Sequence, residues 1–274
     1  MADIYGMPFE YNNLSSKEFG LIIANVETDR AMECSGEIEG QYVFNKKTKS
    51  RYLVNNDYSG SPRSIEIDVL TADGRTLDIH EQRKISKWLL NKHDYRKLYL
   101  DKTFDNGETV EYIKGQEKRL YLNCRFINPQ KLEYNGGVVG WRVTLDTDSG
   151  MFWQDAVVIT YDLSKQTLPC IIKIPVDTDI DDYTYPEVTI NADDTGGTIT
   201  IINTTDDTSR ITQLIEINSG AVVNMKGSIN YVNGQYYQKL YEQNFIRLLD
   251  GVNNISVDGA IKSISFKYQN RRFF

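Results

Sequence analysis

Two histidines, His80 and His93, are the first candidates for acid–base chemistry in this sequence. A histidine that activates a serine or cysteine nucleophile must be oriented by a third group, and such enzymes carry recognisable nucleophile motifs. No Gly-x-Ser-x-Gly motif accompanies either histidine, and the sequence contains neither of the Gly-rich loops that bind nucleotide phosphates. We therefore interpret both as solvated helix residues, and we predict no catalytic residue and no cofactor.

An acidic string, Asp177-Thr178-Asp179-Ile180-Asp181-Asp182, is the one segment that looks like a metal site. Its alternating aspartates match the start of a calcium-binding loop. The sixth position, where that loop requires Gly, is Asp182, and the twelfth, where it requires Glu, is Val188. We therefore interpret the string as a solvated acidic linker and predict no metal site.

Aromatic side chains could also form a sugar site, since the chain has 18 tyrosines and 3 tryptophans. However, Trp88 lies on the apolar stripe of a predicted helix, while Trp141 and Trp153 flank strand patterns, so we expect the tryptophans to pack in cores. No local spacing identifies a pair of carboxylates for glycoside hydrolysis. The residues alone indicate a protein that is not an enzyme.

The composition limits the classes of partner. Hydrophobic residues make up 40% of the 274 and charged residues 25%, which suits a soluble globular chain of about two domains. A net charge of −7 lacks the basic footprint of a nucleic-acid binder. The longest apolar runs, such as Leu21–Ala24, are far shorter than the about 20 residues of a membrane helix. We expect no nucleic-acid partner and no membrane insertion.

The cysteines give a further indication of where the protein is made. Cys34, Cys124 and Cys170 are odd in number and far apart, so they fit neither a disulfide framework nor the close ligand pairs of a zinc site. We expect reduced, half-buried cysteines in a protein made in a cytoplasm.

One amphipathic helix is predicted to begin after Asp78. Asp78 can cap it, and Glu81, three residues on, completes a capping box. Ile85, Trp88 and Leu89 follow at positions i, i+3 and i+4, so they share one apolar face.

Residues 38–55 predict a β-hairpin. Tyr42 and Phe44 alternate on one arm, Tyr52 and Val54 alternate on the other, and residues 45–49 form a polar tip.

The rest of the chain reads as strands, most densely after residue 187, where turn signals separate them at intervals typical of a β-sandwich. We place the domain boundary within Asp162–Tyr185, where prolines interrupt an acidic segment, and predict domains at 1–165 and 166–274. The predicted fold class is mostly β.

Several segments resemble the distal tail proteins (Dit) of long-tailed, non-contractile bacteriophages. Residues 9–21, FEYNNLSSKEFGL, are similar to the short strand, Ser-led turn and Phe-Gly-Leu that open the family. Residues 85–90 and 95–98 resemble its I-x-x-W-L helix and following strand. Residues 249–255, LDGVNNI, and 264–268 resemble its closing turn and final strand.

The resemblance implies an N-terminal β-sandwich with one α-helix and a projecting hairpin, and a C-terminal galectin-like jelly-roll β-sandwich. It also implies a structural protein of the virion, made in the host cytoplasm, of which six copies form a ring at the distal end of the tail. Such a ring is a hub that joins the tail tube protein to the tail-tip or tail-associated protein and the receptor-binding protein of a baseplate.

Under this resemblance, the hairpin residues Tyr42, Phe44, Tyr52 and Val54 become candidates for contacts between subunits. An exposed strand edge risks aggregation unless a partner covers it, and closure of a ring supplies that partner. The alternative is an ordinary surface hairpin.

A second hypothesis is a carbohydrate-binding module of a host-recognition protein. Galectin sugar sites use a histidine, and the predicted C-terminal domain has none, although it keeps Arg210, Arg247 and many tyrosines. A glycosidase acting on the cell wall is a third hypothesis.

Overall fold

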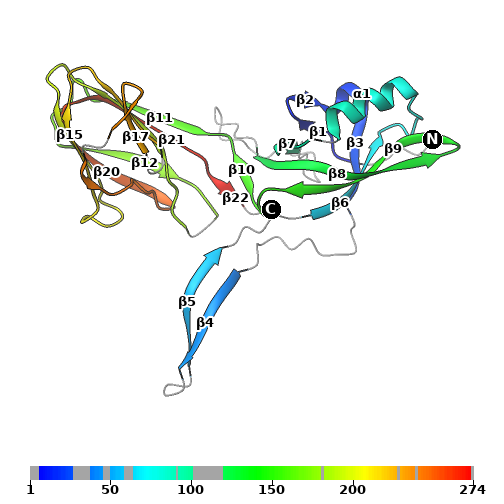
Figure 1. Cartoon of the computed structure of the whole chain (residues 1–274), viewed down its shortest axis with the longest axis horizontal. Helices are drawn as coiled ribbons and strands as arrows, with labels where there is room; N and C mark the ends of the chain where they lie inside the picture. The colour runs from blue at the N-terminus through cyan, green and yellow to red at the C-terminus, as the bar shows by residue number, and fades with distance from the viewer. Residues whose placement is uncertain are drawn as a thin grey trace. The chain divides into compact units, whose positions relative to one another are not determined.

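The computed structural model describes residues 6–26, 38–45, 50–58, 64–90, 92–100, 120–179, 182–226, 229–237 and 240–272. The chain forms two compact units: Met1–Trp153 with Phe273–Phe274, and Gln154–Arg272. Strands dominate both units, and the described residues include one α-helix (Figure 1). The predicted mostly β fold class is confirmed.

The first unit contains a long antiparallel sheet with the strand order β2-β1-β7-β8-β9-β6-β3. Its strands are β1 (Phe9–Tyr11), β2 (Leu14–Ser15), β3 (Leu21–Val26), β6 (Ser64–Thr71), β7 (Arg96–Leu100), β8 (Leu120–Tyr134) and β9 (Gly137–Thr147). A 3₁₀ turn, η1 (Ser16–Phe19), connects β2 to β3, and β10 (Phe152–Gln154) pairs with β8 off this path.

Helix α1 (Ile79–Leu89) packs its apolar face on this sheet. It begins as predicted: the Asp78 carboxylate accepts hydrogen bonds from the backbone N–H of His80 and Glu81, and Glu81 accepts one from the N–H of Asp78. Ile85, Trp88 and Leu89 are buried in one core with strand residues of the sheet. The predicted capping box and apolar stripe are both confirmed.

Strands β4 (Ile38–Asn45) and β5 (Ser50–Tyr58) form the predicted hairpin. They pair with each other over their whole length and make a two-stranded sheet of their own.

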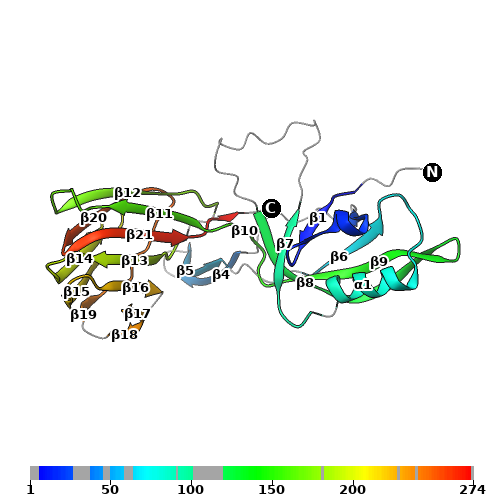
Figure 2. The ribbon, with the colours of Figure 1, turned by 90° about the horizontal axis from the view of Figure 1, so that it is seen from above.

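The second unit consists of two antiparallel sheets on either side of a single apolar core (Figure 2). One has the order β11-β21-β13-β16-β17-β18 and the other β12-β20-β14-β15-β19. The strands of the first sheet are β11 (Val157–Asp162), β13 (Glu187–Ala192), β16 (Val222–Lys226), β17 (Ile229–Val232), β18 (Gln235–Tyr236) and β21 (Ile261–Tyr268). The strands of the second are β12 (Cys170–Val176), β14 (Gly197–Asn203), β15 (Ile211–Ile217), β19 (Leu240–Gln243) and β20 (Gly251–Gly259), and β22 (Arg271–Arg272) ends the described chain.

The boundary between the units lies between Trp153 and Gln154, earlier than the residue 165/166 boundary read from the sequence. The reason is β11, which pairs with β21 from Val157 to Asp162 and so belongs to the second unit. The segment Asp162–Tyr185, interpreted from its prolines as a linker, also lies within that unit. Pro175 is part of β12, an edge strand of the second sheet, where a missing N–H is tolerated.

None of the helices within the described ranges is long and apolar enough to cross a membrane.

Candidate functional site

The β4–β5 hairpin contains the four residues that the sequence suggested for contacts between subunits. In the ladder, Tyr42 is opposite Leu53, and Tyr52 is opposite Val43. Because directly opposed residues share a face of an antiparallel pair, Tyr42 and Tyr52 lie on opposite faces of the ribbon. Their role between subunits stays a prediction.

A register shift further changes how the four residues are arranged. Gln41 is opposite Asn55 while the next residue, Tyr42, is opposite Leu53, so Val54 is the extra residue of a β-bulge. Phe44, opposite Arg51, shares a face with Tyr42. In the ladder, Tyr42 and Phe44 are therefore at positions of one face and Tyr52 is at a position of the other.

What this hairpin can do chemically follows from its backbone. A two-stranded ribbon is marginally stable on its own in water, and its outer edges carry N–H and C=O groups with no ladder partner among the described strands. Such edges can be completed by a strand or surface of another chain.

The two histidines lie at the surface of the first unit. His80 is in the first turn of α1, and His93 follows the helix; both are exposed. The backbone of each takes part in the structure, the His80 N–H at the helix cap and the His93 carbonyl as an acceptor from Arg125. No described residue hydrogen-bonds to either imidazole.

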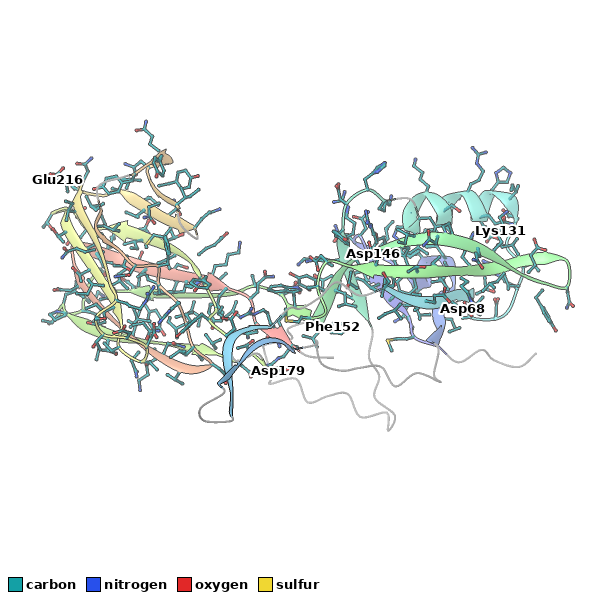
Figure 3. The ribbon with its side chains drawn as sticks, turned by 60° about the horizontal axis from the view of Figure 1, so that its bottom comes forward. Asp68, Lys131, Asp146, Phe152, Asp179 and Glu216 are labelled. Carbon is teal, nitrogen blue, oxygen red and sulfur yellow. The ribbon has the colours of Figure 1, made fainter. Side chains whose placement is uncertain are left out.

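The acidic string pairs with the C-terminal arginines, although the Asp177 and Asp182 side chains remain 77% and 51% exposed. The Arg272 guanidinium donates to Asp177 and, at 2.7 Å, to Asp179 (Figure 3), while Arg271 donates to Asp182 at 3.3 Å. The hydrogen bond with Asp177 raises the pKa of Arg272 above its ordinary value. Within the described ranges, no group of three or more His, Cys, Asp or Glu side chains could hold a metal ion.

The cysteines and tryptophans are mainly structural. Cys124 is fully buried, and burial raises the pKa of its thiol well above the ordinary value, whereas Cys170 is half-buried and Cys34 lies outside the described residues. Trp88 and Trp141 are buried in the first core, as predicted, whereas Trp153 is only half-buried and belongs to neither core. At Cys124 the reactive thiolate form is therefore suppressed.

The arginines considered for a sugar site are engaged within the second unit. Arg247 makes two hydrogen bonds to Asp206, of 2.6 and 3.1 Å, and its guanidinium lies 3.8 Å from the centre of the Tyr183 ring. Arg210 lies 3.9 Å from the same carboxylate. Arg247 is thus bound to Asp206, and Arg210 donates to the Phe245 carbonyl, so both arginines already have partners within the unit and give the carbohydrate hypothesis little support.

Sequence reasoning missed two partly buried ion pairs in the first unit. Arg142 on β9 donates two hydrogen bonds, of 2.8 and 3.0 Å, to Asp68 on β6, and Arg125 on β8 donates one of 2.7 Å to Asp146 on β9 (Figure 3). Each pair joins directly opposed residues of neighbouring strands. They fix the register of the sheet that carries α1.

Sequence reasoning also missed a basic groove between α1 and β8. It has a volume of about 450 Å³ and is lined by Ile79, Gln82, Arg83, Lys84, Ser86, Lys87 and Lys131. Lys131, labelled in Figure 3, reaches from β8 to the Gln82 side chain on α1 at 3.1 Å. The available signal was the run of basic residues along α1, which includes Arg83, Lys84 and Lys87.

Comparisons with known proteins agree with the two-unit architecture. Residues 4–149 match the family described as phage tail protein N-terminal domain, and residues 152–268 match the phage tail C-terminal domain. No curated protein sequence is significantly similar to the chain.

Solved structures of phage proteins are similar to this chain at low sequence identity. The Dit protein of phage SPP1, described as a paradigm of the hub adsorption apparatus in phages infecting Gram-positive bacteria, matches with a TM-score of 0.64 and 9% identity over 97% of this chain and 99% of that chain. Two structures of the phage p2 baseplate in its activated conformation, one with Sr and one with Ca, match with a TM-score of 0.49 and 9% identity, over 96% and 97% of this chain respectively and 97% and 98% of theirs.

Proposed function

This chain belongs to the phage tail protein family, and on that premise we propose that it is the structural hub at the distal end of a phage tail. Six copies form a ring that joins the tail tube protein on one side to the tail-tip or tail-associated protein on the other, with a receptor-binding protein attached to the same baseplate. The protein is a component of the virion.

The observation that carries this proposal is the fold shared along the full length of the SPP1 Dit hub. The likeness includes 97% of this chain and 99% of that one, so both units of this chain take part in it. The order of the two matched domains, N-terminal then C-terminal, agrees with this.

The β4–β5 hairpin supports a ring in particular. A ring needs a heterologous interface, in which one surface of a subunit binds a different surface of the next. A hairpin with free edges provides one half of such an interface, and Tyr42 and Phe44, on one face, would supply its apolar contact. We propose that this hairpin reaches the neighbouring subunit.

The protein acts without catalysis in this proposal. Both histidines are exposed and outside any nucleophile motif, and the acidic string is occupied by Arg271 and Arg272. The work of the protein is to bind several other tail proteins at fixed positions.

The experiment that tests the proposal compares the mass in solution of two variants. Phe44→Asp places a charge on the hairpin face, and Tyr236→Asp makes the same change at an exposed tyrosine of the second unit. We expect Tyr236→Asp to form the same oligomer as the unmodified protein, and Phe44→Asp to be monomeric by light scattering. Equal oligomers from both variants would contradict the role given to the hairpin.

A further inference from the structure

The outward face of α1 concentrates positive charge on an acidic protein. Arg83, Lys84 and Lys87 are exposed on this helix, and Lys131 joins them from β8 across the groove of about 450 Å³. The chain as a whole carries a net charge of −7. Four cationic side chains therefore line one groove of a protein whose net charge is negative.

The fold gives these charges little compensation. Hydrogen bonds from Arg75 and the Asp78 N–H lower the pKa of the Glu81 carboxylate most, and Lys84 is near enough to help lower it. Arg83, Lys84 and Lys87 form no ion pair with any residue that the structure describes. The nearby carboxylate of Glu81 is held by Arg75 at 2.8 Å and by the backbone N–H of Asp78, so it remains at the helix start. Like charges three and four residues apart destabilise a helix. An anion bound in the groove would relieve this repulsion.

The groove also has an apolar end. Ile79, the first residue of α1, is 61% exposed, and it lines the same groove as the basic side chains. The Lys131–Gln82 hydrogen bond joins β8 to the helix and so helps to fix the groove's two walls. A ligand that fits would combine several negative charges with an apolar group.

We propose that this groove docks an acidic peptide segment of another tail protein, with carboxylates on Arg83, Lys84, Lys87 and Lys131 and an apolar side chain on Ile79. The inference rests on the proposed function, since a hub must hold neighbours of different kinds. Charge complementarity of this sort speeds association and selects the partner, and salt weakens it.

A peptide fits these observations better than a nucleic acid. A nucleic acid would extend beyond a groove of this size onto a protein of net charge −7, which repels a long polyanion. An exposed isoleucine offers nothing to a phosphate backbone, whereas it suits a leucine or isoleucine of a peptide.

The test uses fluorescence anisotropy of the full chain with two labelled peptides, EEEELEEE and EEEEEEEE. We expect the Arg83→Glu/Lys87→Glu variant to bind EEEELEEE at least tenfold more weakly than the unmodified protein. The control, Lys165→Glu/Lys173→Glu, makes the same charge change at exposed lysines of the second unit and should bind within twofold of the unmodified protein. Affinity should fall as salt is raised from 50 to 300 mM.

Further variants separate the parts of the groove. Ile79→Ser should lower the affinity for EEEELEEE at least threefold relative to the unmodified protein, while the affinity for EEEEEEEE should stay within twofold. Lys131→Gln should lower the affinity for both peptides. Circular dichroism of each variant establishes that α1 is intact. Equal affinity of the groove and control variants, no binding at 50 mM salt, or tighter binding of single-stranded DNA or phosphatidylserine vesicles than of peptide would each overturn the proposal.

The same variants keep this inference separate from the hub proposal. Arg83→Glu/Lys87→Glu should retain the oligomer, since the groove is not part of the hairpin. If the protein forms the ring but does not bind the peptides, only the docking proposal is refuted. If it binds the peptides but stays monomeric, only the ring proposal is refuted.

Discussion

Replacing Arg142 by methionine is expected to lower the free energy of unfolding of the first unit by about 1–3 kcal/mol. The change keeps most of the aliphatic stem of the side chain but removes both hydrogen bonds to the Asp68 carboxylate. That carboxylate is then left on the sheet without its guanidinium partner.

The magnitude follows from the unequal exposure of the two side chains. The Asp68 side chain is only 10% exposed, so it retains little water, while that of Arg142 is 44% exposed. Breaking a fully buried pair costs about 3–5 kcal/mol, and exposed pairs contribute about 0.2–1 kcal/mol. A pair that is buried on the acidic side alone should lie between these limits.

Tryptophan fluorescence during urea unfolding provides the assay. All three tryptophans belong to the first unit, so their fluorescence reports the unfolding of that unit without interference from the second. A double-mutant cycle with Arg142→Met and Asp68→Asn then isolates the interaction between the two side chains. We expect a coupling energy of about 1–2 kcal/mol.

Asp94 and Arg96 of the same unit form the matched control. Their side chains are 3.4 Å apart, and that of Arg96 is 46% exposed, close to the value for Arg142, but that of Asp94 is 77% exposed. The cycle with Asp94→Asn and Arg96→Met should give a coupling below about 0.5 kcal/mol. Equal coupling energies in the two cycles would refute the reasoning that burial of the carboxylate sets the magnitude.

Three further predictions use the same protein. Arg272→Ala should make the chain more sensitive to limited proteolysis at residues 177–182, because it frees Asp177 and Asp179; unchanged cleavage there would contradict this. Raising the pH from 7 to 9.5 should destabilise the first unit, because burial holds the pKa of Cys124 above its ordinary value of 9.0 and the unfolded chain loses that proton first. Cys124→Ala should flatten this pH dependence, and an unchanged slope would speak against it. His80→Gln and His93→Gln should leave the oligomer and its stability within about 0.5 kcal/mol of the unmodified protein, as is usual for exposed positions; a larger loss would show that an imidazole has a partner.

The features that the sequence predicted correctly are those encoded within a few residues. The capping box of Asp78 and Glu81 and the apolar stripe of α1 depend on contacts three or four positions apart, so their spacing is visible in the chain. The hairpin is likewise local, with Asn45 opposite Ser50 at its tip.

The features that were missed depend on residues far apart in the sequence. Arg272 reaches Asp179 across 93 positions, and no pattern around the acidic string indicates this partner. The groove needs Lys131, which lies 49 positions from Gln82. The domain boundary was misplaced because a proline-containing segment looks like a linker, whereas Pro175 sits in an edge strand that needs fewer backbone donors.

Native mass spectrometry of the purified protein tests the central claim most directly. Each chain has a mass of 31.5 kDa, so six times 31.5 kDa predicts a complex of 189 kDa. Six chains carry six times −7, or −42, so the measurement is best made after assembly at 150 mM salt or above, where the about 8 Å screening length reduces repulsion between subunits. A dominant species of 189 kDa would support the ring, and a protein that stays at 31.5 kDa at every salt and protein concentration would contradict it.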